Sequence, residues 1–83
     1  MTESRQNRLA IYISEQCFNC RHALEVAEGI RRRYPATVVE VVDVGTASEA
    51  VPDVVFATPT YILNEHVWSL GNPSEEMIRE AFG

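Results

Sequence analysis

The feature that most constrains the fold of this chain is where its two cysteines lie. Cys17 and Cys20 stand three residues apart, and the chain has no other cysteine. The apolar run before them, LAIYI at residues 9–13, predicts a buried strand, and the pattern after them is helical. A CxxC pair between a strand and a helix admits three interpretations: a structural disulfide, part of a metal site, or a redox centre.

The residues after the cysteines predict a crossover between two strands. From about residue 17 to residue 34, apolar residues recur at spacings of three and four, which indicates an amphipathic helix that ends before Pro35. Residues 37–44, TVVEVVDV, predict a second strand, and Glu40 within it favours an edge position. A strand, a helix and a strand in this order predict a parallel pair with a right-handed crossover.

The C-terminal half predicts a hairpin and a last helix. A short helix at most is expected at residues 46–52, and residues 59–63 and 66–70 predict two strands joined by a tight turn. Asn72 is the predicted N-cap of the last helix, with Pro73 in its first turn. The order β-α-β-(α)-β-β-α predicts an α/β fold with a four-stranded mixed sheet and flanking helices.

Length and composition limit the class of protein. Eighty-three residues, 46% of them hydrophobic, predict a single domain over residues 1–83 with a flexible start at residues 1–7. The net charge of −5 argues against a nucleic-acid partner, and no apolar run is long enough to cross a membrane. The first residues carry no apolar segment of a secretory signal, so a cytoplasmic protein is expected.

The structural and metal interpretations of the cysteine pair are the weaker ones. A bridge between Cys17 and Cys20 closes a very short loop, so it constrains the unfolded chain little. A structural zinc site usually takes four ligands, and the only histidines, His22 and His66, are irregularly spaced from the pair. No metal is therefore expected.

The redox interpretation follows from the expected place of the pair at a helix N-terminus. Free N–H groups and the helix dipole favour a thiolate there, so we expect Cys17 at the exposed tip with a pKa below its usual value of about 8.5. Cys20, one turn further on, is expected to be more buried. It is spaced to attack Cys17 once Cys17 has formed a mixed disulfide.

Two segments resemble the thioredoxin-like superfamily in its short, glutaredoxin-like form. They are CFNC after LAIYIS, and TPTYIL about forty residues later, followed by a hairpin, a glycine and a final helix. The resemblance covers roughly residues 8–83. It implies a cis peptide bond before Pro59, beside the cysteines, and a backbone at Thr58 that pairs with the substrate chain. With Phe18 and Asn19, between the cysteines, these residues form the expected substrate-binding set.

The chain also departs from the patterns of this superfamily. Glutaredoxins usually carry a basic residue just ahead of the motif, which contacts glutathione. Here Glu15 stands in that stretch and the chain has no lysine, which argues against glutathione binding. The first strand lacks the buried acid of thioredoxins, which leaves water, Glu40 or Asp43 as the proton acceptor for Cys20. Phe18 is expected to be exposed at the rim of the site.

The resemblance therefore implies a thiol–disulfide oxidoreductase. Its Cys17/Cys20 dithiol would reduce protein disulfides, an upstream reductase would regenerate it, and no cofactor other than the redox-active disulfide is expected. The alternative is a binding module with the same fold, in which the CxxC pair acts as a redox switch. The sequence leaves the direction of electron transfer open.

Overall fold

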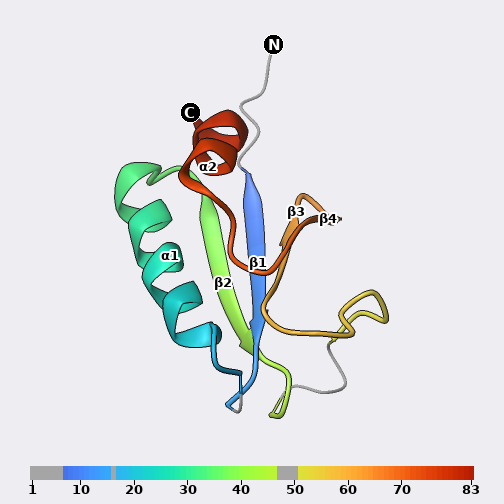
Figure 1. The fold of residues 1–83 in the computed structure, drawn as a ribbon. Coiled ribbons are helices and arrows are strands. Elements are labelled where there is room, and N and C mark those ends of the chain that lie inside the picture. The colour runs from blue at the N-terminus through green and yellow to red at the C-terminus, as the bar shows by residue number, and fades with distance from the viewer. Residues whose placement is uncertain (1–6, 16, 47–50) are drawn as a thin grey trace.

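The computed structural model describes residues 7–15, 17–46 and 51–83, and these form a four-stranded sheet and two helices. The elements are, in chain order, β1 (Arg8–Ile13), α1 (Cys20–Arg33), β2 (Val38–Asp43), β3 (Thr60–Leu63), β4 (His66–Leu70) and α2 (Glu75–Phe82). The strand order is β2-β1-β3-β4, with β1 parallel to β2 and antiparallel to β3 (Figure 1). The predicted α/β fold with a mixed sheet is confirmed, and β2 is an edge strand, as its glutamate indicated.

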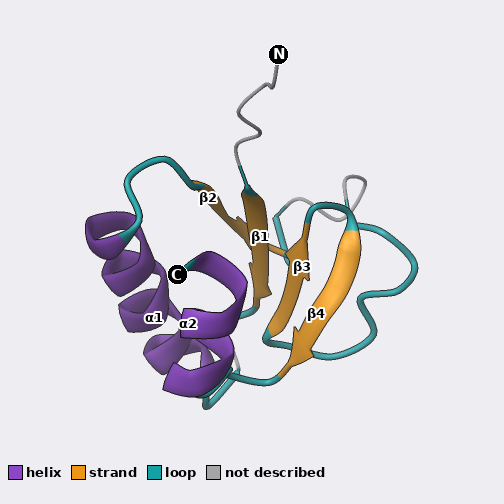
Figure 2. Cartoon of the chain, turned by 90° about the horizontal axis from the view of Figure 1, so that it is seen from above, coloured by secondary structure: helices purple, strands orange, loops and turns teal. Residues whose placement is uncertain are grey.

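Both helices cover the same face of the sheet (Figure 2). Because side chains alternate along a strand, Leu9 and Ile11 of β1 point to this face together, while Ala10 and Tyr12 point to the other. The core lies between the sheet and the helices. Its fully or almost fully buried members are Leu9, Ile11, Ala23, Ala27, Ile30, Tyr61 and Ile78.

A group of aromatic rings attaches α2 to the rest of the fold. Trp68 of β4 meets Tyr61 and Phe82 edge to face, with ring centroids 6.0 Å and 5.5 Å apart. Phe82 also stacks on Tyr34, which follows α1, at 5.6 Å. An eight-residue helix is too short to be stable alone in water, so these contacts and the buried Ile78 hold α2 in place.

The start of α1 differs from the sequence prediction. The helix begins at Cys20 rather than near Cys17, and Asn19 is its N-cap residue. Asn19 makes no capping bond with its side chain. Residues 17–19 instead form a turn between β1 and the helix, a distinction that a hydrophobic pattern cannot make because the turn carries no core residue. The end of the helix agrees with the prediction, since Tyr34 caps it directly before Pro35.

The N-cap predicted for α2 was wrong by two residues. Ser74 is the cap, and its hydroxyl accepts a hydrogen bond from the backbone N–H of Met77 at 3.1 Å. The side chain of Asn72 is engaged elsewhere, in contacts with Tyr61 and Asn19. Both residue types are good caps, and the tertiary contacts of Asn72 decide between them.

The hairpin formed by β3 and β4 agrees with the prediction. Its two turn residues, Asn64 and Glu65, have φ of 52° and 73°, the positive values that a two-residue hairpin turn requires. The frayed start predicted at residues 1–7 and the short helix considered at 46–52 fall mainly on residues 1–6 and 47–50, outside the described residues. None of the described helices has the length and apolar character needed to cross a membrane.

Candidate active site

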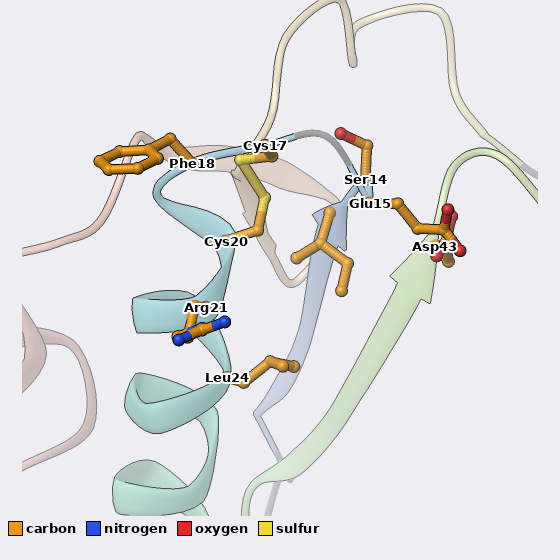
Figure 3. Close-up of a pocket in the computed structure, with 9 residues that line it drawn as sticks. Ser14, Glu15, Cys17, Phe18, Cys20, Arg21, Leu24 and Asp43 are labelled. Carbon is orange, nitrogen blue, oxygen red and sulfur yellow. A yellow bond between two sulfur atoms is a disulfide. The ribbon is translucent and has the colours of Figure 1, made fainter.

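Cys17 and Cys20 form a disulfide at the N-terminal end of α1 (Figure 3). Their Cα atoms are 5.3 Å apart, well within the range that a disulfide spans. Cys17 is half-buried in the turn after β1, whereas Cys20, the first residue of the helix, is only 3% exposed. Cys20 is the more buried of the two, as expected, but Cys17 is half-buried rather than exposed as the sequence predicted.

The turn that carries the cysteines is held by backbone hydrogen bonds of modest quality. The N–H of Cys17 donates to the carbonyl of Ser14, and the N–H of Cys20 donates to the carbonyl of Cys17, both at 3.3 Å. The first helical bond runs from Ala23 N–H to the carbonyl of Asn19 at 3.2 Å. The cysteines therefore lie where the chain passes from a central strand into a helix, and the helix dipole favours negative charge there.

A cavity of about 590 Å³ opens beside the disulfide. Glu15 and Asp43 lie together on one wall, while Arg21 lies further along α1 (Figure 3). Asp43 is fixed in part by its own loop, because one carboxylate oxygen accepts a hydrogen bond from the N–H of Gly45 at 2.8 Å. The wall nearest the end of β2 is therefore acidic, and the one cation among the lining residues belongs to the helix.

The segment before β3 lies beside the cysteine loop, where β1 ends and β3 begins. Because β1 and β3 are antiparallel, the end of β1 and the start of β3 lie side by side. The hydroxyls of Ser14 and Thr58 are 3.3 Å apart and connect the two segments. The peptide bond between Thr58 and Pro59 is cis, which confirms the conformation implied by the family resemblance.

Two exposed aromatic residues flank this region. Phe18 is 95% exposed and lies at the rim of the cysteine cavity, which it helps to line (Figure 3). Phe56 is 78% exposed and lines a second hollow of about 260 Å³ together with Ser14 and Thr58. Sequence analysis missed Phe56; its only signal was an aromatic residue two positions before the Thr-Pro pair and outside any predicted strand.

The two carboxylates considered as proton acceptors for Cys20 lie in different places. Asp43 lines the cysteine cavity, whereas Glu40 lines a separate cavity of about 410 Å³ that also contains Tyr12. There, burial and then the nearby Glu40 raise the pKa of Tyr12. Asp43 is therefore the better placed of the two.

The histidines do not approach the cysteines as a ligand set. His22 is exposed on α1, where a ring nitrogen lies 3.3 Å from a carboxylate oxygen of Glu25. Within residues 7–15, 17–46 and 51–83, no group of three or more His, Cys, Asp or Glu side chains comes together in a way that could hold a metal ion.

Comparison with solved structures identifies the fold. No protein-family model matches the chain, and no curated protein matches it in sequence. Solved structures do match. The thioredoxin of Fasciola hepatica superposes with a TM-score of 0.75 at 21% identity, over 93% of this chain and 78% of that one. Thioredoxin O2 from Arabidopsis thaliana, in its oxidised state, gives 0.75 at 16% identity, over 94% and 76%.

The oxidised thioredoxin of Plasmodium falciparum is similar to the same degree, with a TM-score of 0.73 at 20% identity over 94% of this chain and 83% of its own. The TM-scores of these three matches establish the fold. Their sequence identities, 16–21%, are too low to transfer an activity, which must be argued from the site. The chain therefore has the thioredoxin-like fold, with a disulfide-forming CxxC pair at the start of its first helix.

Proposed function

We propose that the protein is a thiol–disulfide oxidoreductase that uses the Cys17/Cys20 dithiol to reduce disulfides in proteins. The observation that carries the proposal is the arrangement of the two sulfurs. Cys17 is half-buried, and Cys20 lies behind it with 3% exposure. A nucleophile that meets the substrate and a sheltered thiol that reacts only with its neighbour are the two parts that thiol–disulfide exchange needs.

The reaction proceeds in two balanced steps. The Cys17 thiolate attacks one sulfur of the substrate disulfide, the substrate S–S bond breaks, and the departing sulfur leaves as a thiolate that takes a proton from water. Cys20, after loss of its proton, then attacks Cys17 in the mixed disulfide and releases the second substrate thiolate. Two electrons pass to the substrate, and the Cys17–Cys20 disulfide remains. An upstream dithiol reductase returns it to the reduced form.

The surroundings of the pair favour a protein substrate over glutathione. Glu15 and Asp43 line the cavity beside the sulfurs and disfavour the carboxylates of glutathione. Phe18 at the cysteine cavity and Phe56 in the hollow beside Ser14 and Thr58 offer exposed aromatic surface, and exposed aromatic residues are frequent anchors in protein interfaces. We extend the proposal to a backbone contact between Thr58 and the substrate chain, with Phe18, Asn19 and Pro59 as its neighbours, and to a reducing compartment such as the cytoplasm.

A second candidate function is a binding module whose disulfide acts as a redox switch. The observation in its favour is the almost complete exposure of Phe18, which a small catalytic site does not require. The rate at which Cys17 is alkylated at neutral pH separates the two candidates. A reactive Cys17 fits the enzyme, whereas a thiol no faster than a free cysteine peptide fits the module.

The direct test is reduction of a protein disulfide such as those of insulin, with a dithiol as the electron source. We expect the wild type to turn over, Cys17→Ser to be inactive, and Cys20→Ser to accumulate a mixed disulfide with the substrate. The matched control is the double variant, which should do neither. Full reductase activity in Cys17→Ser would overturn the mechanism.

A further inference from the structure

The side chain of Asn72 connects the cysteine turn to the centre of the fold. Its amide nitrogen donates to the backbone carbonyl of Asn19, between the two cysteines, at 3.2 Å. Its amide oxygen accepts a hydrogen bond from the hydroxyl of Tyr61 at 2.7 Å. Asn72 thus uses both of its polar atoms, one toward the turn and one toward a fully buried residue of β3.

The residue before it secures the same segment to the other half of the site. The N–H of Gly71 donates to the carbonyl of Pro59 at 2.9 Å. Gly71 has a φ of +90°, a conformation that other residues rarely adopt, and this bend turns the chain from β4 toward α1. Consecutive residues therefore contact Pro59 and Asn19, so the Gly71–Asn72 pair fixes the CxxC turn relative to the Pro59 loop.

The cysteine turn has little else to hold it once the disulfide is reduced. Its own two backbone bonds are long, at 3.3 Å each, and Asn19 provides no side-chain cap. Apart from the bonds within α1, the hydrogen bond from Asn72 is the only one between described residues that reaches residues 17–20 from outside residues 14–23. In the oxidised protein the S–S bond closes the turn, but in the dithiol this hydrogen bond is what remains from outside.

We propose that Asn72 is a positioning residue that keeps the CxxC turn closed in the reduced protein and in the mixed disulfide, so that Cys20 stays within reach of Cys17. The inference rests on the proposed function. A turn held in the reactive geometry raises the effective concentration of the Cys20 thiol at the Cys17 sulfur. The hydrogen bond therefore favours closure of the internal disulfide and speeds release of the substrate.

Two single variants separate this role from ordinary stability. Asn72→Asp keeps an oxygen that accepts from Tyr61 but removes the N–H that donates to Asn19. Tyr61→Phe is the matched control, because it removes the hydroxyl and leaves the amide of Asn72 free to hold the turn. Since an aspartate also adds a negative charge, the neutral variant Asn72→Leu in the Tyr61→Phe background repeats the test with no buried hydroxyl left unpaired.

The first measurement is the equilibrium of the Cys17–Cys20 pair with reduced and oxidised dithiothreitol, read as the oxidised fraction by mass. Loss of the hydrogen bond is expected to weaken the internal disulfide by about two- to tenfold. For a two-electron couple this makes the potential less negative by about 10–30 mV. Both Asn72 variants should show this shift, and Tyr61→Phe should keep the wild-type potential although it lowers the stability of the fold.

The second measurement is the rate of resolution. Reduced protein is mixed with 5,5′-dithiobis(2-nitrobenzoate), which releases one coloured thiolate when Cys17 attacks and a second when Cys20 resolves the mixed disulfide. The second phase should slow by the same about two- to tenfold in the Asn72 variants, with the first phase less affected.

The results distinguish a failure of the proposed role of Asn72 from a failure of the proposed function. Wild-type potentials and wild-type second phases in both Asn72 variants would overturn the role of Asn72 alone. An equal shift in Tyr61→Phe would also overturn it, because general loosening would then explain the effect. If the wild type itself shows no reversible couple, the proposed function fails and the role of Asn72 fails with it.

Discussion

Reduction of the disulfide should lower the stability of the fold by an amount that the structure predicts. The bridge spans a sequence separation of three, so it closes a loop of four residues. The chain-entropy relation then gives about 2 kcal/mol of stabilisation at 25 °C. In the reduced protein, the interaction of a Cys17 thiolate with the N-terminus of α1 offsets about 0.3–1 kcal/mol of this. The net loss on reduction is therefore about 1–2 kcal/mol.

Urea unfolding of the oxidised protein, repeated with excess phosphine reductant, measures this difference. With a slope of about 1 kcal/mol per molar urea for a domain of this size, the midpoint should fall by about 1–2 M on reduction. The double variant Cys17→Ser/Cys20→Ser is the control, and its midpoint should not respond to the reductant.

Whether reduction lowers or raises the stability of the fold indicates the direction in which the protein passes electrons. An oxidised form that is the more stable one means that the fold favours the disulfide, as suits a protein that gives electrons to its substrate. A reduced form that is equally or more stable would refute the reasoning and would indicate a protein that delivers disulfides, because strong oxidants of this class owe their potential to a stabilised reduced form.

Three further predictions concern the elements that support the site. Ile78→Ala, at the one buried residue of α2, should cost about 2–5 kcal/mol in urea unfolding and Ile78→Val about 0.5–1.5, and equal costs would contradict the packing described. Ser74→Ala should cost about 1 kcal/mol through loss of the cap to Met77, whereas Ser74→Asp should stay near the wild type; a neutral alanine variant would argue against this cap. Burial raises the pKa of Tyr61 above the value of about 10 that it has in the unfolded chain. The protonated hydroxyl therefore favours the folded state fully below a pH of about 10, and this stabilisation is lost as the pH rises further. In urea unfolding, Tyr61→Phe should lose less stability than the wild type between neutral and alkaline pH. The same pH dependence in both proteins would contradict this role of Tyr61.

Local sequence patterns predicted the elements of this fold well. The apolar run at residues 9–13 and the valine-rich run at 37–44 became neighbouring parallel strands, because strand periodicity and the crossover rule both act over short stretches of chain. The pair of cysteines after a strand placed the site at the start of α1. The cis bond before Pro59 came from the family resemblance and not from the residues alone.

The parts that the sequence could not predict depend on contacts between distant residues. Asn72 and Ser74 are both suitable N-caps, and the contacts of Asn72 with Tyr61 and Asn19, 11 and 53 positions away, decide that Ser74 takes the role. The sequence named both Glu40 and Asp43 as candidate proton acceptors, and only the alignment of β1 and β2 decides that Asp43 is the one beside the cysteine cavity. Patterns with periods of two to four residues carry no information about such pairs.

The central place of β1 in the sheet has a consequence for how the molecule opens. With β2 on one side and β3 on the other, β1 has partners along both of its edges, whereas β2 and β4 each have one. Native proteins open in units, and outer strands exchange their amide hydrogens with water sooner than inner ones. Ser14 follows β1 directly, so the loop to Cys17 is attached to the last strand to be released. Either edge strand, β2 or β4, can therefore open locally while the loop from Ser14 to Cys17 stays attached to β1.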